Sequence, residues 1–140
     1  MVNIAEFRHE NQELVDLCAI LNVLVVNADL RSNSVFCELL ERFSNRIKAH
    51  LDHEDRSIYA ELLNHDDKNI NKVANQFMNN THQLRQILSS YIKRWCHHPG
   101  AGSDTTGHEV FLKETQAIFH LVDERIKLES NKLFPVLEGA

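Results

Sequence analysis

The sequence predicts an all-α fold, an up-down-up-down bundle of four helices. Its 140 residues include only two prolines and four glycines, and long segments without either favour helices over a loop-rich or all-β fold. Apolar residues also recur at helical spacing through four segments. Because a chain of this length can bury one sizeable core, we expect residues 1–140 to form a single domain.

The first two helices are expected over residues 3–28 and from the N-cap candidates Ser32, Asn33 and Ser34 to about Leu63. The first carries one apolar stripe, formed by Phe7, Leu14, Leu17, Cys18, Leu21, Leu24 and Val25. The stripe of the second helix includes two polar residues among the apolar ones: Leu39, Leu40, Phe43, Ile47, His50, Glu54 and Ile58.

The other two helices are expected over residues 67–96 and from His108 to about Leu137. Asp66 and Asp67 are candidates to cap the third helix. Between the third and fourth helices, residues 97–107 hold three of the four glycines and one of the two prolines, which predicts a long loop. Four amphipathic helices with three connections make a bundle the most economical arrangement.

Composition excludes several classes of function. The net charge of -5 and pI near 6.0 give no basic surface for nucleic acid. No apolar run approaches the length of a membrane span, so no membrane partner is expected, and the first residues mix charges with apolar positions, unlike a signal peptide. The three cysteines, Cys18, Cys37 and Cys96, are odd in number and far apart, which predicts no disulfide framework and a reduced, cytoplasmic setting.

Two segments of the sequence share the same spacing of charged and aromatic residues. His50 and Glu54 lie four residues apart, so a helix places both on one face, where they can hold a single metal ion. Arg125 and Glu129 repeat this spacing, and each glutamate is followed five residues later by an aromatic residue. The second stretch therefore has an arginine where the first has its histidine.

A four-helix bundle with an inward His-x3-Glu pair and a Phe134–Pro135 ending resembles the hemerythrin-like (HHE) family over nearly the whole chain. The resemblance implies two non-haem irons bridged by two carboxylates in the bundle interior. It implies reversible binding or sensing of dioxygen or nitric oxide rather than turnover. Its metal ligands in this sequence would be His9, His50, Glu54, His82 and Glu129.

The helical period tests each of these ligand candidates, because a ligand must project into the bundle. His50 and Glu54 fall within the stripe of the second helix. Glu129 falls on the axis of the fourth stripe, where an unpaired carboxylate is costly, so it either binds a metal or meets a cation such as Arg125. His9 and His82 lie toward the flanks of their stripes, and a partly exposed imidazole is the alternative for both.

If His9 does not reach inward, Glu10 and Glu13 are substitute ligands, since carboxylates also suit iron or manganese. His120 and Glu124 share the His-x3-Glu spacing but project about 180° from the Glu129 face, so we expect both on the surface.

Two functions fit these patterns. The first is a non-haem iron protein with a dinuclear centre, or one reduced to a mononuclear site built from His9, His50 and Glu54. The second is a metal-poor or metal-free interaction domain in which Arg125, which has no lone pair for a metal, neutralises Glu54 and Glu129. The sequence also resembles the repair-of-iron-centres proteins, although these carry an N-terminal cysteine-bearing segment that is not found here. It leaves open the metal, the partner and whether the bundle forms a homodimer.

Overall fold

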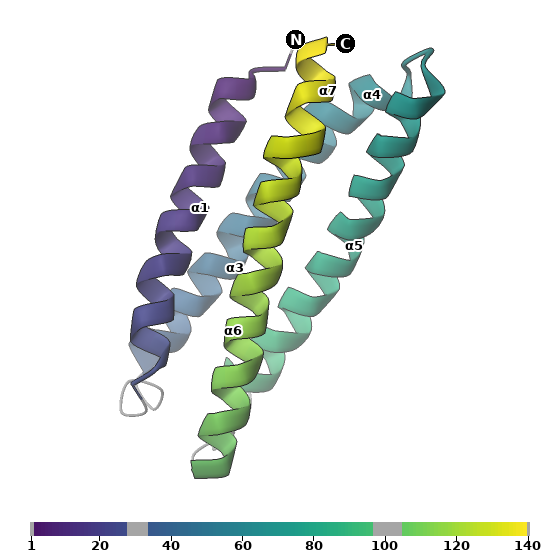
Figure 1. Cartoon of the computed structure of the whole chain (residues 1–140). Helices are drawn as coiled ribbons and strands as arrows, with labels where there is room; N and C mark the ends of the chain where they lie inside the picture. Colours follow the sequence, from purple (N-terminus) through teal and green to yellow (C-terminus); the bar gives the residue numbers. More distant parts are fainter. Residues whose placement is uncertain (1, 28–33, 97–104, 140) are drawn as a thin grey trace.

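The computed structural model describes residues 2–27, 34–96 and 105–139, and these form four long helical rods that lie side by side (Figure 1). The first rod is α1 (Ile4–Val25). The second is α3 (Ser34–Glu54), which continues through one π-helical turn (Asp55–Tyr59) into α4 (Ala60–Leu63). Both ends of the chain lie at the same end of the bundle, as an up-down-up-down order requires.

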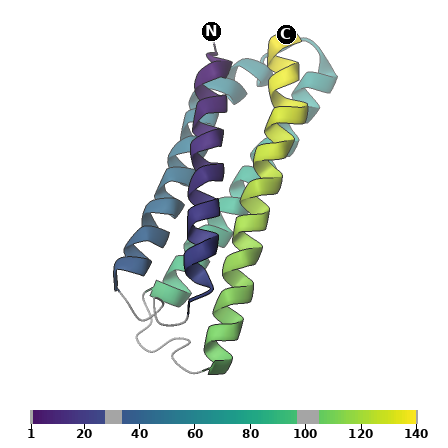
Figure 2. The same ribbon diagram turned by 60° about the vertical axis from the view of Figure 1, so that its left-hand side comes forward.

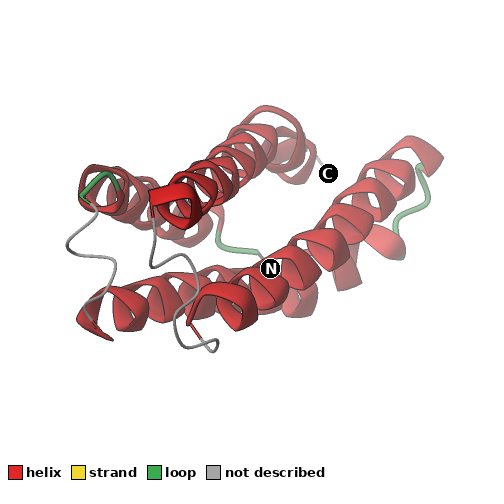
Figure 3. Cartoon of the chain, turned by 90° about the horizontal axis from the view of Figure 1, so that it is seen from below, coloured by secondary structure: helices red, strands yellow, loops and turns green. Residues whose placement is uncertain are grey.

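The third rod is α5 (Lys68–Cys96), and the fourth is α6 (Thr105–Leu128), which continues through a second π-helical turn (Glu129–Leu133) into α7 (Phe134–Gly139). Helix α1 packs against α3 and α6, and α5 packs against the same two helices; Figure 2 brings α1 and α6 forward. No strand occurs among the described residues (Figure 3). The predicted all-α bundle is confirmed.

The predicted helix boundaries are close to those observed. Asn3 caps α1, because its side chain accepts a hydrogen bond from the Glu6 amide at 3.2 Å. Asp67 does the same for the start of α5, accepting from the Asn69 amide at 2.8 Å. The cap candidates Ser32 and Asn33, and residues 97–104 of the predicted loop, lie outside the described residues. The loop prediction was wrong for residues 105–107, which already belong to α6.

Two apolar clusters fill the bundle, and a polar layer separates them along every rod. The larger cluster includes Leu14 of α1, Leu51 of α3, Leu84 of α5 and Ile126 of α6. The smaller cluster, near the chain ends, includes Phe7, Ile58, Phe77 and Leu133 of the same four rods. At this boundary the rods contribute buried polar residues: Asn11, Glu54, Thr81 and Glu129 lie between the clusters, and His50 and Arg125 stand one turn before the two glutamates.

The expectation that the cysteines are unpaired was wrong for two of the three. Cys37, near the start of α3, and Cys96, at the end of α5, form a disulfide with their Cα atoms 5.7 Å apart, and only Cys18 is free. Residues 59 positions apart meet because α3 and α5 are antiparallel neighbours. The reduced setting expected from the sequence rested on the absence of a disulfide, and the structure contains one. Within the described ranges, no helix combines the length and apolar character that crossing a membrane requires.

Candidate metal centre

His50, Glu54 and Glu129 form the centre of the polar layer, and we call them the inner triad. His50 Nε2 lies 2.8 Å from Glu54 Oε1 and 3.0 Å from Glu129 Oε1. The side chain of His50 is 5% exposed and both carboxylates are fully buried. One donor atom from each residue lies within 4.8 Å of the other two, so the three could hold one metal ion.

Both carboxylates of the inner triad adjoin a π-helical turn. Glu54 immediately precedes the turn Asp55–Tyr59, and Glu129 begins the turn Glu129–Leu133. The residue spacing that occurs twice in the sequence is therefore accompanied twice by the same local structure, a π-helical turn. Such π-turns inside α-helices occur often at functional sites.

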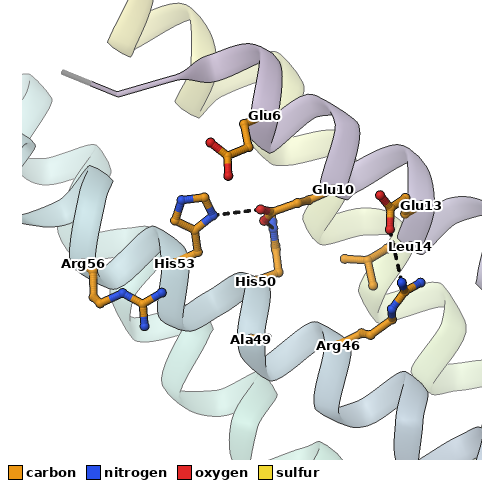
Figure 4. A pocket seen from close by; sticks show the side chains of 9 residues that line it. All are labelled: Glu6, Glu10, Glu13, Leu14, Arg46, Ala49, His50, His53 and Arg56. Atoms are coloured by element: carbon orange, nitrogen blue, oxygen red, sulfur yellow. Dashed lines mark hydrogen bonds and ion pairs between the residues drawn. The ribbon is translucent and has the colours of Figure 1, made fainter.

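Glu10 holds the His50 ring from the other side. His50 Nδ1 donates to Glu10 Oε1 at 2.7 Å, and His53 Nδ1 donates to Glu10 Oε2 at 2.8 Å (Figure 4). The Phe7 ring stacks on His53 with ring centroids 4.1 Å apart. A carboxylate on the far nitrogen of a histidine is the usual means of fixing the orientation of a metal ligand, so His50 is directed at the two buried carboxylates.

One oxygen of the inner triad has unused acceptor capacity. His50 Nε2 donates to Glu129 Oε1, whereas Glu54 Oε1, although 2.8 Å from the same nitrogen, lies outside hydrogen-bond geometry and accepts no hydrogen bond from the described residues. A buried carboxylate oxygen without a hydrogen bond is costly. The donor set of one imidazole and two carboxylates, with this oxygen facing the histidine, fits a transition-metal cation.

Arg125 neutralises the two carboxylates through their other oxygens. Its Nε donates to Glu129 Oε2 at 2.8 Å and its Nη2 to Glu54 Oε2 at 3.1 Å. The guanidinium is 4% exposed, and it makes four further hydrogen bonds, to Tyr59 Oη, Thr81 Oγ1, Asn80 Oδ1 and the Phe77 carbonyl. Every direction in which it can donate is used, which is what a buried guanidinium requires.

The charges of this layer shift its pKa values. Burial alone would lower the pKa of His50, but the hydrogen bond to Glu129 and the close carboxylates of Glu129 and Glu54 outweigh it and raise that pKa to about 11. Burial raises the pKa of Glu54, and the adjacent Glu129 carboxylate adds to this effect. Burial acts the same way on Glu129, but hydrogen bonding by His50 and the charges of His50 and Arg125 hold the pKa of Glu129 below its usual range. Without a metal, His50 is therefore a cation at neutral pH.

The structure brings three of the five predicted ligands together and leaves two outside. His9 is exposed and pairs with Glu13 at 2.8 Å, and His82 is exposed on α5. In each helix the neighbouring residue takes the inward direction, Glu10 in the first case and the buried Thr81 in the second.

Neither of the substitute ligands, Glu10 and Glu13, is a member of the inner triad. Glu10 reaches the site, but as the partner of His50, and Glu13 instead pairs with Arg46 at 3.4 Å. His120 and Glu124 are exposed, which confirms the surface position predicted from the helical period. Sequence reasoning missed Thr81, Asn80 and Tyr59 as partners of Arg125; the inward position of Thr81 on the third stripe was the available signal.

A family model settles the relationship of the chain to known proteins. The model of the hemerythrin HHE cation-binding domain matches residues 2–137. The chain belongs to the hemerythrin HHE family. Comparison of this hemerythrin-like domain with curated proteins and with solved structures found no significant match.

Proposed function

We propose that this hemerythrin-like domain binds a single non-haem iron at the inner triad and presents it to dioxygen or nitric oxide. The observation that carries the proposal is the convergence of His50 Nε2, Glu54 Oε1 and Glu129 Oε1 in a buried layer, with Glu54 Oε1 accepting no hydrogen bond from the described residues. Imidazole and carboxylate donors suit iron, manganese or zinc better than magnesium or calcium.

Three protein donors leave coordination positions free. Ferrous iron at the inner triad would supply the open position at which a diatomic gas binds. The residues of the chain do the rest: Glu10 orients His50, and the apolar clusters on either side of the layer keep bulk water away from Glu54 and Glu129. Their role is binding and exclusion of solvent, which supports gas binding or sensing rather than turnover.

One iron, rather than two, follows from Arg125. Each buried carboxylate has one oxygen toward His50 and the other toward the guanidinium. A second metal ion between these carboxylates would compete for their Oε2 atoms, and both of these accept hydrogen bonds from Arg125. The guanidinium thus supplies, as a permanent charge, the compensation that a second metal would supply.

Anaerobic iron loading tests this function. Protein purified without a histidine tag is loaded with ferrous iron, desalted and analysed for iron. We expect one retained iron per chain, and a visible nitrosyl band on addition of nitric oxide. The variant Glu129→Gln removes a donor and should lose the retained iron, whereas Glu124→Gln, the same change at an exposed position of α6, should keep it. Absence of retained iron in the wild type would contradict the proposal.

A metal-free interaction domain is the second candidate, and one observation favours it. Protonated His50 and Arg125 already place two positive charges beside Glu54 and Glu129, so the carboxylates are compensated without any metal. Thermal unfolding separates the candidates, because a ligand that binds only the folded state must raise the melting temperature. No change on adding ferrous iron would favour the metal-free domain, which would then act by binding a second copy or another protein.

A further inference from the structure

A surface cavity of about 380 Å³ opens from solvent onto His50, one residue of the inner triad. It lies between α1 and α3, and its walls include the buried His50 together with Glu6, Glu10 and His53 (Figure 4). Glu54 and Glu129 are fully buried. Because His50 belongs both to the cavity wall and to the inner triad, the cavity brings solvent next to the ring that contacts both carboxylates.

The cavity mouth carries a second set of metal donors. Glu6, Glu10 and His53 can each bring one ligand atom to within 4.8 Å of the other two. His53 is held in place by stacking on Phe7 and by its hydrogen bond to Glu10 Oε2. Figure 4 shows the Glu6 carboxylate directed from α1 toward the His53 ring. We call these three residues the outer triad.

The chemistry of the donor atoms, rather than the net charge of the cavity, suits a cation at this place. Three carboxylates and two guanidiniums line the cavity, and Arg46 is already paired with Glu13 at 3.4 Å. Arg56 is the other guanidinium of the lining, and His50 is paired with Glu10 at 2.7 Å. One imidazole with two carboxylates is a donor set for a divalent transition metal rather than for magnesium or calcium.

Glu10 links the two triads. Its Oε1 accepts from His50 Nδ1 at 2.7 Å, and its Oε2 accepts from His53 Nδ1 at 2.8 Å. One carboxylate therefore serves as a donor in the outer triad and as the partner that orients a donor in the inner triad. An ion held at the outer triad is one histidine side chain away from the buried site.

We propose that Glu6, Glu10 and His53 form a second, solvent-facing cation site, which captures a divalent transition metal and from which the inner triad is loaded. Capture is independent of the function proposed above; loading rests on it. Because the outer triad is partly exposed, its ion exchanges readily and is lost on desalting, whereas the ion of the inner triad is retained.

Cobalt(II) is the probe, since its visible bands report each site. By equilibrium titration the wild type should bind two ions per chain, one weakly. The double variant Glu6→Gln/His53→Gln should bind only the inner ion, with similar affinity, and its uptake should slow on the order of tenfold, the lower end of electrostatic effects on association rates. Glu13→Gln is the matched control, because it removes the same charge from the same cavity and should bind and load as the wild type does.

The inner-site variant Glu129→Gln separates the two proposals. It should keep the weak ion and lose the retained one, and adding Glu6→Gln should then remove the weak ion as well. An unchanged number of weak ions in Glu6→Gln would overturn the outer site, whatever happens at the inner triad. Loss of the weak ion with no change in the rate of inner loading would overturn the loading role. Glu6 is exposed, so the single variant should fold even if the double variant does not.

Discussion

Arg125 and Glu129 are joined by a hydrogen bond from Nε to Oε2 at 2.8 Å, one turn apart on the fourth rod. The same guanidinium reaches Glu54 Oε2 through Nη2 at 3.1 Å. The two carboxylates therefore lie between two cationic groups, His50 at their Oε1 atoms and Arg125 at their Oε2 atoms. Each carboxylate therefore joins two cationic side chains, one through each of its oxygens.

Removal of the guanidinium should destabilise the metal-free protein strongly. Arg125→Met keeps the approximate length of the side chain but leaves two buried carboxylates with one fewer compensating charge, which should cost on the order of 3 to 5 kcal/mol. Urea unfolding at neutral pH measures the loss. Arg46→Met, at an exposed arginine, is the control and should change the stability little. A loss below about 1 kcal/mol for Arg125→Met would show that the ion pairs contribute no more than surface pairs.

Replacement of Arg125 by histidine should make room for a second metal ion. Arg125→His restores the His-x3-Glu spacing before Glu129 and frees the Oε2 atoms of Glu54 and Glu129. After anaerobic iron loading and desalting, we expect more retained iron than in the wild type, approaching two per chain, and part of the lost stability should return with the metal. Two retained irons in the wild type would contradict the role given to Arg125.

The fold and half of the site follow from the period of single helices. Each apolar stripe states which face of its helix turns inward, and this is why the bundle, the inward positions of His50, Glu54 and Glu129, and the outward positions of His120 and Glu124 could be predicted. Contact of Arg125 with both carboxylates could be inferred from the free-energy cost of burying an unpaired charge, because a buried carboxylate needs a compensating cation.

The contacts between different helices depend on how the helices are rotated and aligned against one another, and the sequence did not predict them. A period within one helix cannot show that Glu10 of α1 meets His50 of α3, or that Thr81 of α5 meets Arg125 of α6. His9 lies one residue from the inward position, and that offset of about 100° places it in solvent. The Cys37–Cys96 bond likewise joins the ends of two neighbouring helices, and no local pattern connects residues 59 positions apart.

The disulfide should stabilise the bundle measurably. Closing a loop between Cys37 and Cys96, 59 residues apart, restricts the unfolded chain, so Cys37→Ser/Cys96→Ser should lower the free energy of unfolding by about 2 to 4 kcal/mol. Chemical denaturation with and without a reductant measures this, and the reductant should have no effect on the double variant. Cys18→Ser is the control, because Cys18 is free. Equal stability of oxidised and reduced wild type would contradict the pairing.

Two of the exposed histidines, His82 and His120, should be dispensable. His82→Gln and His120→Gln change exposed side chains, so each should alter stability by less than about 0.5 kcal/mol and leave retained iron unchanged. His50→Gln is the contrast, since it removes the nitrogen that faces both carboxylates and should abolish retention. Iron lost from the His82 variant would show that α5 turns this side chain inward when metal binds.

Metal affinity should rise with pH, and the cause is the proton on His50. In the metal-free protein the pKa of His50 is raised from 6.5 to about 11, so the stability that this protonated group contributes is fully present below pH 6.5 and is lost as pH rises through 11. A metal needs the Nε2 lone pair and must displace one proton. Between pH 7 and 9 the apparent affinity for zinc, which is free of redox side reactions, should therefore increase about tenfold per pH unit. Competition titrations across this range give the slope, and a pH indicator in weak buffer counts the proton released at each pH. His53→Gln should show the same slope, because His53 Nδ1 serves Glu10 rather than the inner triad. An affinity independent of pH would mean that His50 is already neutral in the metal-free protein and releases no proton when the metal binds.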